Sequence, residues 1–327
     1  MSTKINRIAV YTSGGDAPGM NAAIRAVVRT GAYHDLHVYG IKNGYDGLIK
    51  GEISRLEKGD VANIIHRGGT ILKTARSEEF KTPEGRKMAY DVLKANEIDA
   101  LVAIGGDGTF TGAKLFYEEY KFPIIGIPGT IDNDLYGTDL AIGFDTAVNT
   151  AVNAVDRIRD TADSHDRLFF IEVMGRNSGF IALHTAIASG ASGVLIPESS
   201  TDIHELVEHL EKAKRRQKLF NLVIVAEGND EGGAMEIVKM VNEIHPEFET
   251  KVTVIGHLQR GGSPTAADRI IASRLGYASV NALIEGRYNV MAGLIDDKLT
   301  FTPFKYAISE ARKPPNALMH MARILSL

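Results

Sequence analysis

The sequence predicts an α/β fold in which helices cover both faces of largely parallel sheets. Short apolar runs that are typical of buried strands alternate with amphipathic helical patterns along the whole chain. Glycine-rich loops follow several of the apolar runs, as they do where a strand leads into a phosphate-binding helix. With 327 residues, the chain is too long for one small core, and one or two domains are expected.

The first half of the chain supplies four of the expected strands, at Arg7–Thr12, Leu36–Ile41, Asp99–Ile104 and Pro123–Ile127. Its first helix begins at Asn21 and is closed by Gly31. The segments between the strands predict a turn at Asn43–Gly47, a short helix near Asp60–His66 and a longer helix at Pro83–Asn96.

The second half continues the same alternation. Its expected strands are Arg167–Val173, Gly193–Pro197, Asn221–Ala226 and Thr253–Ile255. Its expected helices are Gly143–Asp163, Phe180–Ser189, Asp202–Lys218 and Ala266–Ile284. The remaining segment, Tyr288–Leu327, is expected to carry one more strand and a terminal helix.

Composition narrows the functional classes. Apolar residues make up 44% of the chain and charged residues 24%, as in ordinary globular proteins. A net charge of −4 over the whole chain argues against nucleic acid and membrane partners. The absence of cysteine excludes disulfides and thiolate metal sites, which fits the cytoplasm. The N-terminus is not a signal peptide and no apolar run approaches the length of a membrane span, so a cytoplasmic location is expected.

Loops that could hold a phosphate follow the predicted strands, at the edge where open α/β sheets bind ligands. The strongest is Gly105–Thr109 (GGDGT): glycines let the backbone approach closely, the aspartate suits Mg²⁺ and the threonine can bond to phosphate. Ser13–Gly19 can present backbone N–H groups to phosphate, although it lacks the lysine of a P-loop. Arg67–Thr70 and Thr74–Ser77 form another glycine- and hydroxyl-rich loop, with an arginine in each part.

The heptapeptide Pro128–Asp134 (PGTIDND) follows a buried strand. If the chain stays extended there, Asp132 and Asp134 point to the same side and make a carboxylate pair beside the hydroxyl of Thr130. Asp, Asn and Gly are also common turn residues, so the heptapeptide alone leaves a plain polar turn open.

Together, the strand-end residues match phosphoryl transfer, in which positioning and charge neutralisation supply most of the catalysis. A serine hydrolase or a zinc protease fits less well, because the chain contains neither G-x-S-x-G nor H-E-x-x-H. Spacing does not exclude a glycosidase pair of Asp132 and Asp134, but that function leaves the glycine loops without a purpose.

Six motifs, in order along the chain, resemble those of the bacterial-type ATP-dependent 6-phosphofructokinases. They are Thr12–Arg25 (TSGGDAPGMNAAIR), Arg67–Thr70 (RGGT), Ala103–Thr109 (AIGGDGT), Pro128–Asp134 (PGTIDND), Glu172–Arg176 (EVMGR) and Gly256–Pro264 (GHLQRGGSP). The resemblance runs from the first strand to near the C-terminus. It implies two doubly wound αβα domains: residues 1–142 plus 256–305 for ATP and Mg²⁺, and residues 143–255 plus 306–327 for the sugar phosphate.

The resemblance also implies roles for individual residues. Asp132 resembles the family's general base, which takes the proton from the 1-hydroxyl of fructose 6-phosphate, and Asp134 would support it. Asp107 resembles the family's Mg²⁺ ligand, and Arg76 would neutralise charge on the transferred phosphoryl group. The residues that match the family's ATP site are Gly15, Tyr45, Arg76, Ser77, Gly106, Asp107, Gly108, Thr109 and Gly112. The residues that match the family's sugar-phosphate site are Thr130, Ile131, Asp132, Met174, Gly175, Arg176, Glu227, His257, Leu258, Gln259 and Arg260.

The same resemblance implies an oligomeric state and a phosphoryl donor. The family is homotetrameric, and Arg167 is similar to an arginine that reaches the sugar phosphate of a neighbouring subunit. A second such arginine is replaced by Lys251, which keeps the charge but loses the bidentate fork. Pyrophosphate-dependent relatives tend to carry Asp and Lys where this chain has Gly108 and Gly129, so ATP is the expected donor.

An effector site for ADP or phosphoenolpyruvate is also implied between subunits. The residues that match it are Arg25, Arg29, Arg159, Arg216 and Lys218. Three others depart from it: Ser192 replaces a glutamate, Asn63 an aspartate and Phe220 a histidine. Weakened or altered allosteric control is therefore expected.

Two other functions remain open. A different GGDGT kinase, of the NAD-kinase or lipid-kinase type, accounts for Gly105–Thr109 but not for the other motifs. A catalytically silent sensor of sugar phosphates or nucleotides could use the same fold, although the retained Asp107, Asp132 and Arg176 argue against lost chemistry.

Overall fold

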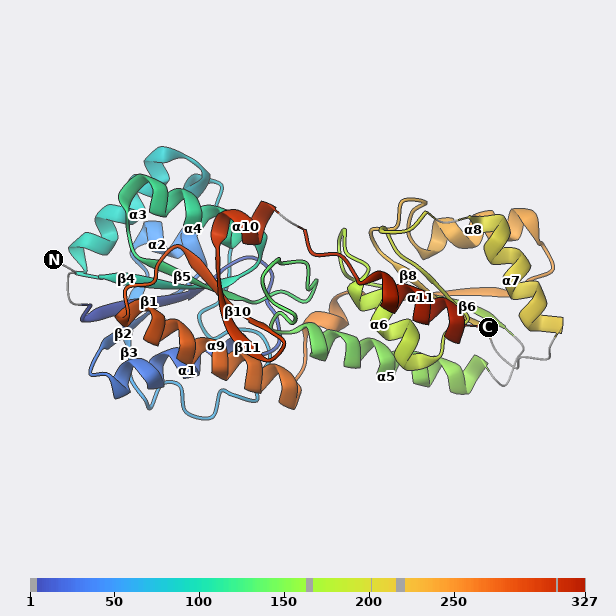
Figure 1. Ribbon diagram of the computed structural model, residues 1–327, viewed down its shortest axis with the longest axis horizontal. Coiled ribbons are helices and arrows are strands. Elements are labelled where there is room, and N and C mark those ends of the chain that lie inside the picture. The colour runs from blue at the N-terminus through green and yellow to red at the C-terminus, as the bar shows by residue number, and fades with distance from the viewer. Residues whose placement is uncertain (1–4, 163–166, 201, 216–220, 310, 327) are drawn as a thin grey trace. The chain divides into compact units, whose positions relative to one another are not determined.

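The computed structural model describes the chain except for residues 1–4, 163–166, 201, 216–220, 310 and 327. The chain forms two compact units (Figure 1). Unit 1 consists of Met1–Ile131, Leu135–Thr146 and Arg260–Ala311. Unit 2 consists of Asp132–Asp134, Ala147–Gln259 and Arg312–Leu327. Within the described part of the chain, no helix is long and apolar enough to cross a membrane.

Unit 1 is built on a seven-stranded sheet in the order β11-β10-β5-β4-β1-β2-β3. The strands are β1 (Arg7–Thr12), β2 (His37–Ile41), β3 (Ile53–Leu56), β4 (Ala100–Gly105), β5 (Ile124–Pro128), β10 (Val290–Ile295) and β11 (Lys298–Pro303). The neighbouring strands from β10 to β2 pair in parallel, whereas the edge strands β3 and β11 pair antiparallel. Every residue of β4 and β5 is buried, as continuous apolar runs in a parallel sheet predict.

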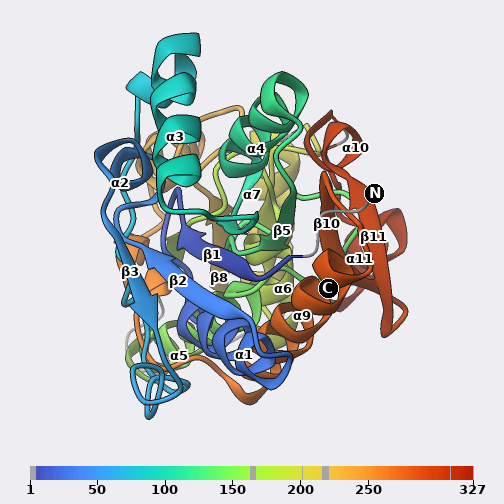
Figure 2. The same cartoon turned by 90° about the vertical axis from the view of Figure 1, so that its left-hand side faces the viewer.

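Helices cover both faces of this sheet (Figure 2). One face carries α1 (Met20–Tyr33) and α9 (Ala266–Ile284), which pack closely against each other. A Cβ at Gly276 would lie 2.7 Å from the Cβ of Ala26, so glycine permits this approach. The other face carries α2 (Gly44–Lys50), the 3₁₀ helix η1 (Glu79–Lys81), α3 (Pro83–Ala95), α4 (Asp107–Tyr120) and α10 (Phe304–Ser309).

Unit 2 has a four-stranded parallel sheet in the order β7-β8-β6-β9. Its strands are β6 (Leu168–Val173), β7 (Gly193–Leu195), β8 (Asn221–Ala226) and β9 (Thr250–Val254). Its helices are α6 (Phe180–Ser189), α7 (Ile203–Arg215), α8 (Ala234–Ile244) and α11 (Asn316–Leu325), together with most of α5 (Phe144–Ala162). Phe170 and Ile171 are consecutive residues of β6, so they point to opposite faces, and both are fully buried. This sheet is therefore also covered on both sides.

The α/β fold is confirmed, but several local predictions were wrong. Helix α1 continues past Gly31 to Tyr33, because this glycine packs against Val38 rather than ending the helix. Asn43–Gly47 is not a simple turn, since Asn43 takes a left-handed conformation and caps helix α2. Residues 60–66 form turns, with left-handed Asn63 interrupting any helix.

The C-terminal segment contains a hairpin instead of a single strand. Strands β10 and β11 pair antiparallel across Asp296 and Asp297, whose φ angles are 49° and 61°. Two consecutive left-handed residues are the signature of a tight hairpin turn, and aspartate tolerates that conformation. The antiparallel edge strand β3 was also missed, because its residues Ile53–Leu56 are only partly apolar.

A buried carboxylate fixes the start of α5 within unit 1. Asp268, on α9, is fully buried and accepts the backbone N–H groups of Gly143 and Thr146, each at 2.8 Å. It also accepts the hydroxyl proton of Thr146. Burial raises the pKa of the Asp268 carboxyl above its ordinary value of 3.8, and the hydrogen bonds from Thr146 and Gly143 oppose that shift.

This raised pKa predicts a pH-dependent stability difference between the wild type and Asp268→Asn. Because the folded state favours the protonated carboxyl, its stabilising contribution is complete below pH 3.8 and is lost as the pH rises through the raised pKa. The asparagine variant cannot accept both N–H groups and is less stable throughout, but its deficit should narrow as the pH rises above 3.8. Urea unfolding of both proteins measures the difference. A deficit that widens with pH would contradict the assignment.

Candidate active site

The carboxyl ends of β1, β4 and β5 meet at one edge of the sheet in unit 1. The Ser13 N–H donates to the Ile104 carbonyl at 3.0 Å, and the Gly129 N–H donates to the Gly105 carbonyl at 2.9 Å. The hydroxyl of Thr109 donates to the Ser13 carbonyl at 3.1 Å. From β1 the chain runs first to β2 on one side and later to β4 on the other, which is where open α/β sheets form a ligand crevice. Three of the predicted loops are therefore held together.

The loop that carries Arg76 and Ser77 is tied to the same edge. The Thr74 hydroxyl donates to the Gly14 carbonyl, and the Thr12 hydroxyl donates to the Lys73 carbonyl at 2.8 Å. The side chain of Asn21, which is 1% exposed, accepts the Ile71 N–H at 2.8 Å. It also donates to the carbonyls of Arg67 and Gly68. Sequence reasoning missed the organising role of Asn21, although the residue lies inside the first motif.

The N-terminus of α4 presents a site for an anion. Gly106 precedes the helix, Asp107 and Gly108 are exposed at its start, and the first N–H groups of a helix have no partner within the helix. Such N–H groups, with the positive end of the helix dipole, favour phosphate. Thr109 is only 3% exposed, and its hydroxyl proton is directed to Ser13 rather than outward.

Tyr45 contacts the first turn of α4. Its hydroxyl donates to the Thr109 carbonyl at 2.6 Å, and burial raises the pKa of the phenol, which keeps that proton in place. A Cβ at Gly112 would lie 2.9 Å from the Tyr45 ring, so the glycine allows the ring to approach the helix. Tyr45 is 6% exposed, and its structural contacts within unit 1 are therefore extensive.

Arg260 lies against the first loop. A Cβ at Gly15 would meet the Arg260 guanidinium at 2.6 Å, and Nη1 donates to the Asp16 carbonyl at 3.2 Å. Both residues belong to unit 1, as does Thr130, whose side chain lies beside Gly106.

The heptapeptide Pro128–Asp134 is not extended at its acidic end. Asn133 adopts a left-handed conformation with a φ of 54°, so the expectation that Asp132 and Asp134 share one face of an extended chain was wrong. Asp132 is only 4% exposed, and its backbone carbonyl accepts the Ser178 hydroxyl at 3.0 Å. Ile131 is fully buried and still belongs to unit 1, whereas Asp132 already belongs to unit 2.

In unit 2, predicted site residues follow the carboxyl ends of the adjacent strands β6, β8 and β9. Glu227 accepts the N–H groups of Gly175 and Arg176 at 3.3 and 2.7 Å, which holds a turn in which both have positive φ. Gln259 is fully buried and accepts the Met174 N–H at 2.8 Å. Of the predicted site residues at this edge, Arg176, His257 and Leu258 are exposed.

Arg167 and Lys251 lie at the opposite, amino-terminal edge of the same sheet. Arg167 precedes β6, Lys251 is near the start of β9, and both pair with Glu249, at 2.6 and 3.7 Å. Strand β6 has six residues, which separates this edge from Met174 by roughly 20 Å at about 3.3 Å per residue. The structure therefore does not bring these two basic residues to the edge that carries Arg176.

The predicted effector residues are only partly placed. Arg25 and Arg29 are four residues apart on α1, and burial, with the Arg29 charge, lowers the pKa of the Arg25 guanidinium. Arg159 donates to the Ser189 carbonyl at the end of α6, three residues before buried Ser192. Arg216, Lys218 and Phe220 lie outside the described residues.

Comparison with known proteins identifies the family. A family model described as Phosphofructokinase matches residues 7–283. A curated relative from Cytophaga hutchinsonii, named ATP-dependent 6-phosphofructokinase, is 57% identical over 95% of this chain and 95% of its own length. The chain belongs to the phosphofructokinase family.

Two further relatives agree with this assignment. ATP-dependent 6-phosphofructokinase 1 of Thermus thermophilus is 56% identical over 99% of this chain and all of its own length. The solved structure of phosphofructokinase from Saccharomyces cerevisiae matches with a TM-score of 0.89 and 38% identity. That match covers 93% of this chain and 45% of the yeast chain, so this chain spans less than half of the yeast protein's length.

The contact between Glu227 and the Met174–Arg176 turn can be tested without any ligand. Glu227→Ala removes the acceptor of the Arg176 N–H, and a hydrogen bond to a charged group contributes about 1.5–3 kcal/mol. Amide hydrogen exchange at Arg176 should accelerate roughly ten- to hundred-fold. Glu227→Gln keeps an oxygen acceptor and serves as the control, with a smaller change. Equal protection in all three proteins would show that the carboxylate does not hold this turn.

Proposed function

We propose that this protein is an ATP-dependent 6-phosphofructokinase, which transfers the γ-phosphoryl group of ATP to the 1-hydroxyl of D-fructose 6-phosphate in glycolysis. The products are fructose 1,6-bisphosphate and ADP. The observation that carries the proposal is the joining of the first loop, GGDGT and Gly129 at the carboxyl edge of β1, β4 and β5. The names of the bacterial relatives that match nearly the whole chain support it.

On the nucleotide side, the loops of unit 1 would hold the phosphates. The N–H groups at the start of α4 and the glycine backbone around Gly15 provide donors that need no side-chain movement. Arg76 is exposed on the tied loop and would neutralise charge on the transferred group. Ser77, Gly106, Gly108, Thr109 and Gly112 complete this proposed site, with Tyr45 supporting it.

The residues present fit Mg²⁺ held together with a nucleotide. Among the described residues, no group of three or more His, Asp or Glu could hold a metal ion. Mg²⁺ usually keeps several waters and uses one or two carboxylates plus substrate phosphates, and the exposed Asp107 at the phosphate-binding helix provides such a carboxylate. When bound, the ion would neutralise phosphate charge.

On the acceptor side, Asp132 would take the proton from the attacking hydroxyl. A carboxylate in hydrogen-bond reach of that hydroxyl is the requirement for a general base, and Asp134 would support it. Thr130 and Arg176 would stabilise charge near the transferred group. The sugar phosphate would be oriented by Met174–Arg176, Glu227 and His257–Arg260, of which Arg176 and His257 expose their side chains.

A homotetramer is part of the proposal. Arg167 and Lys251 lie at the amino-terminal edge of the unit 2 sheet, away from the residues proposed to bind the sugar phosphate of their own chain. Their basic side chains would reach the sugar phosphate of a neighbouring subunit. ADP or phosphoenolpyruvate as effector, with control altered at Ser192, Asn63 and Phe220, stays a prediction, as do the domain boundaries and the cytoplasmic location.

ATP is favoured over pyrophosphate as the donor because glycine occupies positions 108 and 129, where pyrophosphate-dependent relatives tend to carry Asp and Lys. A Cβ at Gly108 would meet no atom within 4 Å, so the space beside it is open. A Cβ at Gly129 would lie 3.1 Å from Ile104 and Met20, so a longer side chain there would displace the core. A NAD or lipid kinase leaves the acceptor-side motifs without a role. A silent sensor does not need the retained catalytic residues Asp107, Asp132 and Arg176.

Asp132→Ser tests the proposed base. Without the carboxylate, kcat should fall roughly hundred- to ten-thousand-fold, while KM for fructose 6-phosphate changes little. An exposed aspartate of α5, Asp156, provides the control, and Asp156→Ser should keep wild-type turnover. ADP release with fructose 6-phosphate, NAD and a lipid acceptor in parallel separates the rival kinases. Near-normal turnover of Asp132→Ser would refute the assignment of the base.

Gly108→Asp tests the donor site. The side chain fits the free protein, and a carboxylate in the first turn of a helix is compatible with its dipole, so folding should be retained. A negative charge at the start of the proposed phosphate-binding helix repels the triphosphate, and KM for ATP should rise at least about ten-fold. Gly108→Ala is the steric control, with a change of less than about three-fold. An unchanged KM in Gly108→Asp would place the nucleotide elsewhere.

A further inference from the structure

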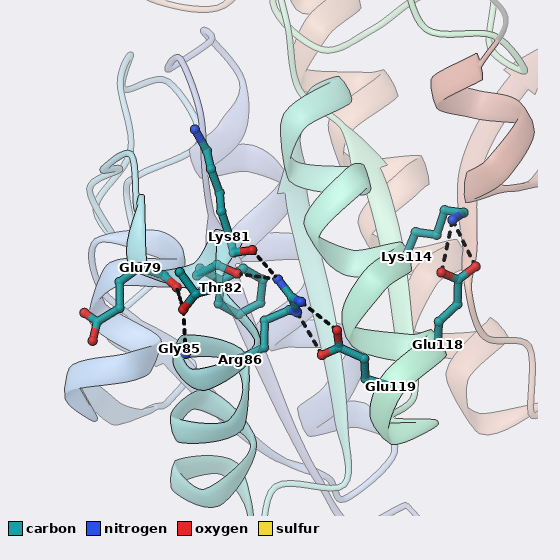
Figure 3. Close-up of polar contacts among 9 residues, drawn as sticks. Glu79, Lys81, Thr82, Gly85, Arg86, Lys114, Glu118 and Glu119 are labelled. Atoms are coloured by element: carbon teal, nitrogen blue, oxygen red, sulfur yellow. Dashed lines mark hydrogen bonds and ion pairs between the residues drawn. The ribbon is translucent and has the colours of Figure 1, made fainter.

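A buried arginine in unit 1 joins α3, η1 and α4 (Figure 3). The Arg86 side chain is 6% exposed and makes a two-bonded pair with Glu119, Nε to Oε2 at 2.8 Å and Nη2 to Oε1 at 2.6 Å. Its third nitrogen, Nη1, donates to the carbonyls of Phe80 and Lys81 at 3.1 and 2.7 Å. All three guanidinium nitrogens are thus used by the protein itself.

Both charges stand at the helix end that does not favour them. Arg86 lies in the first turns of α3, where the dipole disfavours a cation. Glu119 is the last residue but one of α4, where the dipole disfavours an anion. Local preference therefore does not account for either residue, and their pairing across the two helices does. A residue that breaks a local rule is expected to have a tertiary or functional purpose.

The pair closes a ring of contacts around Phe80. The Phe80 N–H donates to the Ser77 hydroxyl at 3.2 Å, and its carbonyl is held by Arg86. Its ring stacks on Tyr45 with centroids 3.8 Å apart. Tyr45 in turn holds the Thr109 carbonyl in the first turn of α4, and the far end of α4 carries Glu119. The segment with Arg76 and Ser77 and the GGDGT turn are thereby fixed to one another.

We propose that Arg86 and Glu119 are positioning residues that set the Arg76–Ser77 segment against the first turn of α4 and so determine nucleotide affinity. This inference rests on the proposed nucleotide site in unit 1. Glu119 lies twelve residues after Asp107, or about 18 Å along the helix at about 1.5 Å per residue, so it acts only through Arg86.

The experiment measures ATP and ADP binding by calorimetry, together with kcat and KM, on the full-length chain. In Arg86→Met, the affinity for nucleotide and the KM for ATP should worsen about ten-fold, while the KM for fructose 6-phosphate stays within about two-fold. Arg86→Lys should resemble Arg86→Met, because an ammonium cannot make the fork and both carbonyl bonds at once. Glu119→Gln, the milder change, should give a smaller loss of the same kind.

Glu118→Gln is the matched control on the same helix. It removes the ion pair between Lys114 and Glu118, which is drawn beside the Arg86–Glu119 pair in Figure 3 and contributes little. Its nucleotide affinity should equal that of the wild type. The double variant Arg86→Met with Glu119→Gln should lose no more than Arg86→Met alone, because the two residues act as one unit.

Two results would overturn the proposal. One is unchanged nucleotide affinity in a folded Glu119→Gln or Arg86→Met protein. The other is an equal loss of affinity for both substrates in Glu119→Gln, which would indicate general destabilisation. If Arg86→Met does not fold, Glu119→Gln alone decides between these outcomes. A wild type that binds ATP but does not phosphorylate fructose 6-phosphate would refute the proposed function and leave this inference testable by binding.

Discussion

The meeting of β1, β4 and β5 at one edge of a parallel sheet is the constraint on which the rest of unit 1 depends. Parallel neighbours end together, so the loops that follow them must share a small volume and satisfy one another's backbone groups. Ser13, Gly105 and Gly129 do so by direct hydrogen bonds. The same arrangement leaves the N-terminus of α4 exposed, so the anion site is a consequence of the topology.

Buried polar side chains then fix the loops that the sheet brings together. Asn21 holds the loop after Arg67, Gln259 holds the backbone at Met174, and Arg86 holds the segment after Ser77. Burying such groups is unfavourable unless their hydrogen bonds are made. The bonds of these residues go to the backbone or, from Arg86, to the partly exposed Glu119.

Much of the fold followed from the sequence because its signals are local. Continuous apolar runs located β4 and β5, and glycine loops after strands located the proposed phosphate site. What failed depended on partners far along the chain. Gly31 was taken as a helix end, although the close approach of Val38 accounts for a glycine at this position. The hairpin depends on the left-handed Asp296 and Asp297, which no apolar pattern reveals. The roles of Asn21 and Arg86 needed tertiary contacts, and the turn at Asn133 needed backbone geometry.

The central claim is that a phosphoryl group passes from ATP to the 1-hydroxyl of fructose 6-phosphate. Phosphorus-31 NMR of the purified chain with Mg²⁺, ATP and fructose 6-phosphate follows donor and acceptor in one sample, with pyrophosphate replacing ATP in a second. The expected result is a new sugar phosphate on carbon 1 that grows as the γ-phosphate of ATP disappears, with no product from pyrophosphate. Turnover with pyrophosphate alone, or loss of the ATP γ-phosphate without a new signal on carbon 1, would contradict the account.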